Sequence, residues 1–80
     1  TDQEEVMEKK ESFRIITGII ASLPENYRSV IQLKDIDGFD YEEIAEKLNM
    51  DISNLRVILS RARKMVREEL KKRKYELVSA

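Results

Sequence analysis

The residues with the clearest chemistry lie in the last third of the chain, where arginine and lysine recur among serine and apolar side chains. At about 100° per residue, a helix beginning near Ile52 would carry one face made of Ser53, Arg56, Val57, Ser60, Arg61, Lys64 and Arg67. Arginine can donate two hydrogen bonds to a guanine edge, serine can bond bases or phosphates, and a valine methyl can pack on a thymine methyl. The face is therefore a candidate for base contact in a DNA major groove.

The mixture of residue types in this face, and not charge alone, favours this interpretation over a face that only keeps a long helix in solution. Charge runs usually form pairs four residues apart, and a merely solvated face would alternate glutamate with lysine. Here residues 54–80 hold nine Lys or Arg against three Asp or Glu, whereas residues 1–53 hold six against 13. The basic third can neutralise phosphates. The acidic part would repel DNA or attract a basic protein surface.

The composition excludes most catalytic and metal chemistry. The chain has no cysteine and no histidine, so disulfides, thiolate metal sites and imidazole bases are unavailable. Its acidic residues follow the polar faces of amphipathic helices and form no predicted catalytic pair. We therefore expect neither an enzyme nor a small-molecule substrate, cofactor or metal.

The chain also lacks the features of a membrane or secreted protein. No stretch reaches the roughly 20 apolar residues that span a bilayer, and no basic segment precedes an apolar run as in a secretory signal. These observations predict a cytoplasmic protein without membrane contact. The first residue is Thr1, which leads us to expect a fragment or processed chain with a further domain upstream.

The element pattern predicts one small all-α domain that positions this face. Apolar residues recur at three- and four-residue steps in four segments, residues 2–23, 24–36, 41–48 and 52–74. The first segment would face the core with Phe13, Ile16, Ile20 and Leu23. The last would do so with Leu55, Leu59, Ala62 and Val66, with Ile58 and Met65 at the edge of that sector.

Local signals mark the connections between these helices. Pro24 ends the first helix and suits the first turn of the second. Asp37-Gly38 indicates a turn, and Asp40 with Glu43 resembles a capping box opening the third helix. Asn49-Met50-Asp51 then forms a tight turn, because Asn tolerates positive φ and Asp is a good N-cap. Met50 can fill the corner, so a helix-turn-helix is predicted.

Three groups of residues resemble the fourth conserved region of bacterial sigma factors, especially the extracytoplasmic-function type. They are Leu23-Pro24-Glu25-Asn26-Tyr27-Arg28, then Tyr41-Glu42-Glu43-Ile44-Ala45 preceded by Gly38, and Leu59-Ser60-Arg61-Ala62-Arg63-Lys64. The resemblance covers roughly residues 22–70. The combination of the three groups at these spacings is far more specific than any one of them.

The resemblance implies a domain whose recognition helix enters the major groove of the promoter's minus-35 element, while other surfaces hold core RNA polymerase. An upstream domain outside this chain would open the minus-10 element. The positions matching the family's base-reading residues are Arg56, Val57, Ser60 and Arg61, and Lys64 continues the same DNA-binding face. Ser53 and Asn54 would lie near phosphates, and Lys34 and Tyr41 match positions that touch backbone phosphates.

The recognition segment departs from the family pattern. Where a Gly-Thr-Val-Lys-Ser-Arg run is usual, this chain has Ser53-Asn54-Leu55-Arg56-Val57-Ile58. Val57 replaces a polar residue at a base-facing position, and Ile58 replaces an arginine. We expect base readout to depend on methyl contacts and on Arg56 and Arg61.

Two alternatives remain open at this point. The chain could be a protein-interaction module held by an anti-sigma factor, or a helix-turn-helix output domain of a response regulator, which would dimerise through its last helix. We expect residues 1–21 to form an N-terminal helix or interdomain linker, residues 22–74 the helix-turn-helix domain, and residues 75–80 a tail. The Lys71-Lys72-Arg73-Lys74 run is interpreted as solvated, with nonspecific, salt-sensitive attraction to DNA.

Overall fold

The described part of the chain is built from helices, with no strand among its residues. The computed structural model describes the backbone of residues 2–79 and the side chains of residues 10–73. Its elements are α1 (Asp2–Ser22), α2 (Glu25–Ile31), the π-helical turn η1 (Gln32–Ile36), α3 (Tyr41–Leu48) and α4 (Ile52–Ser79). The predicted all-α fold with four helices and a long last helix is confirmed.

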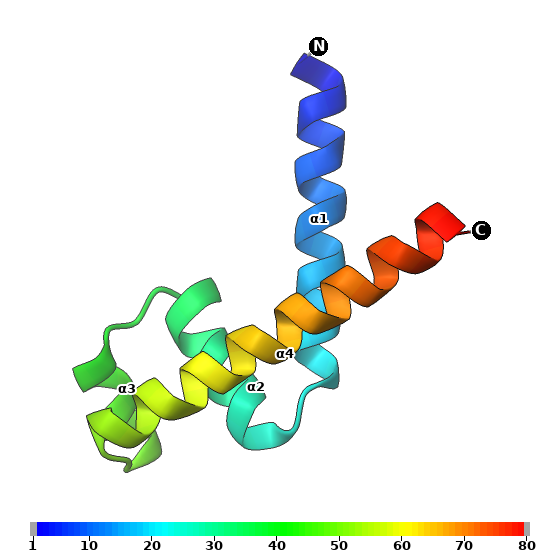
Figure 1. Cartoon of the computed structure of the whole chain (residues 1–80). Coiled ribbons are helices and arrows are strands. Elements are labelled where there is room, and N and C mark those ends of the chain that lie inside the picture. Colours follow the sequence, from blue (N-terminus) through cyan, green and yellow to red (C-terminus); the bar gives the residue numbers. More distant parts are fainter. Residues whose placement is uncertain (1, 80) are drawn as a thin grey trace.

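Helix α4 is the element around which the others are arranged. Figure 1 shows it as a long diagonal, with α2 and α3 beside its N-terminal half and α1 crossing it further along. The start of α1 and the end of α4 extend beyond this region of contact. Both helices therefore have one part within the packed region of the molecule and one part outside it.

Two helix ends differ from the predicted boundaries. Helix α1 ends at Ser22, one residue early, because the ring of Pro24 disfavours helical torsion angles at the residue before it. Helix α4 continues to Ser79, beyond the predicted end at residue 74, because a helix satisfies its own backbone hydrogen bonds without a packing partner. The division into residues 1–21, 22–74 and 75–80 stays a prediction.

The predicted second helix reaches Ile36, but its last turn is wider than an α-helical turn. The N–H of Asp37 donates to the carbonyl of Gln32 at 2.9 Å, and the N–H of Phe39 donates to the carbonyl of Leu33 at 2.9 Å. Gly38 ends the turn with φ of 81°, a torsion angle that glycine adopts without steric cost. The turn signal at Asp37-Gly38 is confirmed, whereas the π-helical widening was not predicted.

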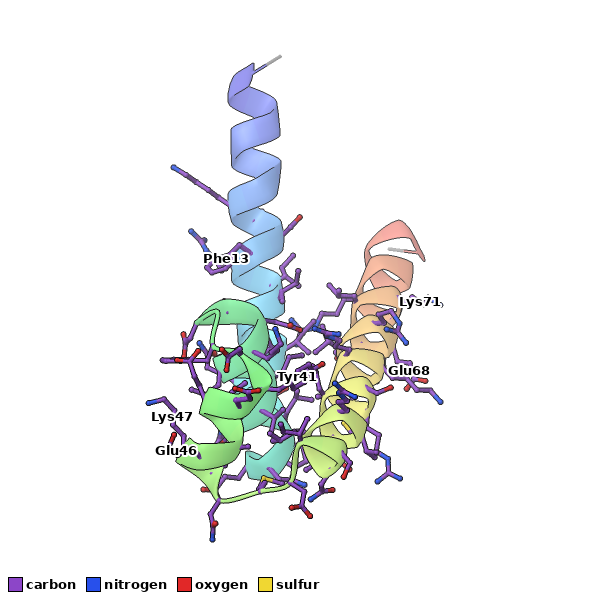
Figure 2. The ribbon with its side chains drawn as sticks, turned by 90° about the vertical axis from the view of Figure 1, so that its left-hand side faces the viewer. Phe13, Tyr41, Glu46, Lys47, Glu68 and Lys71 are labelled. Atoms are coloured by element: carbon purple, nitrogen blue, oxygen red, sulfur yellow. The ribbon has the colours of Figure 1, made fainter. Side chains whose placement is uncertain are left out.

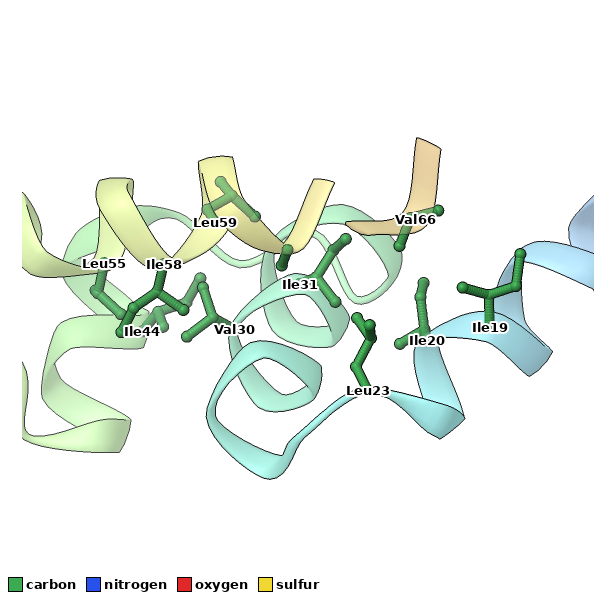
Figure 3. Packing of buried hydrophobic residues seen from close by; sticks show 11 residues of the cluster. Ile19, Ile20, Leu23, Val30, Ile31, Ile44, Leu55, Ile58, Leu59 and Val66 are labelled. Carbon is green, nitrogen blue, oxygen red and sulfur yellow. The ribbon is translucent and has the colours of Figure 1, made fainter. Parts of the chain in front are cut away.

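The core is a single apolar cluster to which all four helices contribute (Figure 3). Helix α4 supplies five of its eleven buried residues, and the full set is Ile19, Ile20, Leu23, Val30, Ile31, Ile44, Leu55, Ile58, Leu59, Ala62 and Val66. The core positions predicted on α4 are confirmed. Ile58, predicted at the edge, is only 7% exposed, so it belongs to the core.

The prediction that Phe13 faces the core is wrong. Its side chain is 58% exposed, and Figure 2 shows it on the side of α1 that points away from α4. The buried part of α1 begins at Ile19, with Ile15 and Ile16 partly buried before it. The apolar stripe of α1 is thus longer than the surface available to cover it.

The helix-turn-helix corner forms as predicted. The Asp40 carboxylate accepts a hydrogen bond from the Glu43 N–H at 2.8 Å, and the Glu43 carboxylate accepts one from the Asp40 N–H at 3.2 Å. Asn49 adopts φ of 52° and ψ of 54°, the left-handed conformation expected of it. Met50 packs against the core, and its N–H donates to the carbonyl of Ala45 at 3.0 Å. These bonds fix the direction in which α4 leaves α3.

A charged pair joins η1 to α4 across the surface. The Arg63 guanidinium donates two hydrogen bonds to the Asp35 carboxylate, one of them from Nε at 2.8 Å. Bidentate pairs of this kind are among the stronger charge-assisted hydrogen bonds. The Asp35 hydrogen bonds raise the pKa of Arg63 above its ordinary value, against a smaller opposing effect of burial. The pair holds η1 in place beside the middle of α4.

The packing of α4 predicts that substitutions at two nearby positions will have very different effects on stability. Leu55 is fully buried, whereas Val57 is 46% exposed. We expect Leu55→Ala to lower the free energy of unfolding by about 2–5 kcal/mol and Val57→Ala to change it by less than about 0.5 kcal/mol. Urea unfolding followed by helical circular dichroism measures both. Equal effects of the two substitutions would show that α4 does not pack by this face.

Breaking the Asp35–Arg63 pair should lower the free energy of unfolding by less than Leu55→Ala does. We expect Asp35→Asn to reduce the free energy of unfolding by about 0.5–1 kcal/mol, with the difference shrinking at high salt. The matched control is Glu69→Gln, which breaks the pair between Glu69 and Arg73, four residues apart on α4 and 3.5 Å from each other, and should cost about 0.3 kcal/mol. Urea unfolding in low salt measures both variants. If Asp35→Asn lowers the free energy of unfolding by no more than Glu69→Gln does, the Asp35–Arg63 pair does not hold η1 against α4.

Candidate nucleic-acid interface

The exposed side of α4 carries the residues predicted to contact DNA. All seven predicted residues of α4 are exposed, namely Ser53, Asn54, Arg56, Val57, Ser60, Arg61 and Lys64. They lie opposite the buried side chains of Leu55, Leu59 and Ala62. Asn54 lies about 100° from Ser53 around the helix, so it belongs to the edge of this face. We call the other six residues the recognition face.

The recognition face is basic along its first three turns. Arg67 continues it by one turn, and the exposed Glu68 then brings a negative charge to the same side of α4. Figure 2 shows Glu68 and Lys71 further along α4 towards its C-terminal end. The uniformly positive stretch therefore ends near Arg67. The side chain of Lys74, in the predicted basic run, lies outside the described side chains.

Val57 is the apolar exception within the recognition face. Its side chain is 46% exposed and lies between basic residues, although burying a valine would stabilise the fold by roughly 1.5 kcal/mol or more. Exposed single apolar residues are common, yet this one lies where a base-reading helix would use a methyl contact. The face thus offers both charge and apolar surface to a ligand.

The structure brings together the two predicted phosphate contacts and Arg56. Lys34 Nζ lies 5.2 Å from the centre of the Tyr41 ring, and Arg56 Cζ lies 5.3 Å from the same centre. Both distances are within the range of cation–π attraction. The three residues come from η1, α3 and α4, and we call them the Tyr41 cluster. Lys34 and Tyr41 are partly buried, whereas Arg56 is exposed.

Tyr41 faces α4, and the outer side of α3 faces the opposite way. Figure 2 shows Tyr41 between α3 and α4, with Glu46 and Lys47 on the far side of α3. Tyr41 also makes a small contribution that raises the pKa of Arg63, so Arg63 lies in the same electrostatic neighbourhood. The carboxylate of Glu46 is thereby kept away from the recognition face.

Sequence reasoning missed the pairings that hold this region together. Arg63 belongs to one of the quoted sequence groups, but its pairing with Asp35 joins residues 28 positions apart. The approach of Arg56 to Tyr41 likewise depends on how three elements meet. The only sequence signals were the charge of Lys34 at the end of a helix and the position of Tyr41 at the start of the next.

Within the described residues, no group of three or more Asp, Glu, His or Cys side chains is arranged to hold a metal ion. No helix in the same part of the chain has both the length and the apolar character needed to cross a membrane.

Comparison with known proteins identifies the family. Residues 13–66 match the model of the family described as Sigma-70, region 4. The ECF RNA polymerase sigma-E factor of Haemophilus influenzae is 33% identical over 67 residues, which cover 84% of this chain and 35% of that protein. The factors of the same name from Escherichia coli K12 and Salmonella typhimurium LT2 are 35% identical over 66 residues, covering 82% of this chain and 35% of each relative.

The matched region contains every helix that forms the recognition face and its support. It begins at Phe13 on α1 and ends at Val66, the last of the buried core residues on α4. The chain spans about a third of the length of the curated relatives that it matches. Since the family model covers more than half of this chain, the chain belongs to the region 4 family of sigma-70 proteins and is similar, within it, to the ECF type.

Proposed function

We propose that this chain binds the minus-35 element of promoter DNA, as the C-terminal domain of an RNA polymerase sigma factor in transcription initiation. The observation that carries the proposal is the recognition face, a basic and partly apolar surface on a helix whose opposite side is fully buried. Membership of the sigma-70 region 4 family supports it. The domain acts by binding, with no catalytic step of its own.

The dimensions of the recognition face suit a major groove. From Ser53 to Lys64 the helix rises about 17 Å at 1.5 Å per residue, and the major groove is wide enough to admit an α-helix. Base edges are contacted by Val57, Ser60 and Arg61 near the middle of this span. Ser53, Asn54, Lys34 and Tyr41 lie around it and contact phosphates, which set the register of the helix on the duplex.

The remaining surfaces serve protein partners, with core RNA polymerase the first of them. The relatives are named as RNA polymerase sigma factors, and most of their length lies outside the part that this chain matches. Glu46, on the outer side of α3, faces away from the recognition face, where it would not oppose DNA binding. The domain acts in the cytoplasm with the polymerase, and a further domain of the same factor opens the minus-10 element.

An anti-sigma factor is a second candidate partner. The observation that favours it is the pair of exposed large apolar residues, Phe13 at 58% and Val57 at 46%. An inhibitor covering the recognition face would bury Val57 together with the basic residues that DNA requires. Co-purification with a protein encoded beside this chain, and release of DNA when that protein is added, would support this candidate. The family match favours a sigma factor over a response-regulator output domain.

The proposal predicts that the chain selects a sequence from a pool of random duplexes. On the selected duplex, we expect Arg61→Ala to weaken binding by about 1–3 kcal/mol and to relax the preference at one base pair. The matched control is Lys71→Ala, which removes one positive charge from the same side of α4 beyond Glu68. It should weaken binding slightly and equally on selected and scrambled duplexes.

Fluorescence anisotropy at low and moderate salt measures these affinities. Arginine at a base edge discriminates between duplexes, whereas a distant positive charge acts on all phosphates alike. If Arg61→Ala weakens binding to the selected and scrambled duplexes by the same factor, Arg61 does not read a base. A random pool that yields no enriched sequence would overturn the proposed function itself.

A further inference from the structure

The Tyr41 cluster places two positive side chains against one aromatic ring. Lys34 Nζ and Arg56 Cζ lie 5.2 and 5.3 Å from the ring centre. An aromatic face carries partial negative charge, so it attracts each of the two cations. The ring therefore draws together two side chains from different elements that would otherwise repel each other.

Among the described side chains, no carboxylate forms an ion pair with either cation of this cluster. Among the side chains of residues 10–73, neither Lys34 nor Arg56 lies within 4 Å of an acidic group. Asp35, which follows Lys34 in the sequence, has both carboxylate oxygens hydrogen-bonded to Arg63. Two cations gathered without a counterion form a site that favours an anion.

Arg56 also differs in position from the other arginine of the recognition face. Around α4, Arg56 lies about 75° from the centre of the exposed side, towards α3 and η1, and Arg61 lies on the other flank. Its guanidinium is held by Tyr41. Among the described residues Arg61 has no such aromatic or acidic partner. Arg61 is thus free to turn towards a base, whereas Arg56 is held beside Lys34.

We propose that Arg56 joins the backbone-phosphate contact proposed above for Lys34 and Tyr41, so that the three residues clamp one phosphate and Arg56 contributes affinity and register rather than base reading. This inference rests on the proposed function and changes the role predicted for Arg56. Tyr41 acts as a positioning residue, because its ring keeps both cations at one point on the rim of the groove. The Asp35–Arg63 pair supports the clamp by fixing η1, and with it Lys34, against α4.

The experiment compares Arg56→Ala with Arg61→Ala, two identical substitutions on neighbouring turns of one helix. Each variant is bound to a duplex of random sequence over a series of salt concentrations, and each is also used to select from a random pool. A lost phosphate contact lowers the slope of log affinity against log salt by about one. We expect Arg56→Ala to lower the slope by this amount and to select the same sequence as the unmodified chain.

The opposite pattern would overturn the clamp. An unchanged slope for Arg56→Ala, or loss of preference at a base pair in its selected sequences, would return Arg56 to base reading. Failure of the unmodified chain to enrich any sequence would overturn the proposed function instead, and the slopes on random duplex would still test the clamp. The two failures are therefore distinguishable.

Variants of Tyr41 test the positioning role without DNA. Tyr41→Phe retains the ring, whereas Tyr41→Leu removes it and retains an apolar side chain for packing. In the free chain we expect Tyr41→Leu to shift the nuclear magnetic resonance signal of the Arg56 Nε–H group, because the ring current is lost, and to leave that of Arg61 unchanged. Tyr41→Phe should leave both close to their original positions. An Arg56 signal that is unaffected by Tyr41→Leu, in a variant whose circular dichroism shows a folded chain, would overturn the positioning of Arg56 by Tyr41.

Discussion

The burial of Leu55, Leu59 and Ala62 along one side of α4 is the interaction on which the rest of the structure depends. Each is at most 1% exposed, and together they contact the other helices through one cluster. Because an α-helix turns about 100° per residue, fixing this side also fixes which residues lie on the opposite one. The recognition face is thus a direct result of packing, and its side chains can change without loss of the core.

The supporting elements hold α4 at its beginning and at its middle. The capping box at Asp40 and the left-handed Asn49 set the angle at which α4 starts. Further along, Asp35 and Arg63 join α4 to η1. These contacts use short-range hydrogen bonds, which depend steeply on geometry. They give a small helical domain the precision that base contacts need, since a site held loosely by about 1 Å loses much of its discrimination.

Features encoded by a few adjacent residues could be predicted from the sequence. The capping box needs only Asp40 and Glu43, and the corner needs only the tolerance of Asn49 for positive φ. The exposed and buried sides of α4 followed from periodicity. Phe13 was placed wrongly because periodicity shows which side of a helix is apolar but not how far its partner extends. The π-helical turn depends on backbone bonds from Asp37 and Phe39, and no side-chain pattern marks it.

In the candidate site, too, features encoded along one helix could be predicted, whereas features that depend on the tertiary structure could not. Membership of the recognition face could be predicted residue by residue, whereas the grouping of Lys34, Tyr41 and Arg56 could not, because three elements must first be placed in space. The pairing of Asp35 with Arg63 joins residues 28 positions apart, and many oppositely charged pairs in a chain with 39% charged residues would look equally plausible.

The length of α4 has a mechanical consequence. Its 28 residues form one continuous helix, about 42 Å long at 1.5 Å per residue, and its contacts with the core continue to the partly buried Leu70. The stretch beyond Leu70 is a lever whose pivot is the packed core. A tilt of about 5° about Leu70 would move the start of the helix at Ile52 by roughly 2 Å, more than a base hydrogen bond tolerates. A force applied to the far end of α4 would therefore be felt at the groove, although nothing at that end touches DNA in the proposed arrangement.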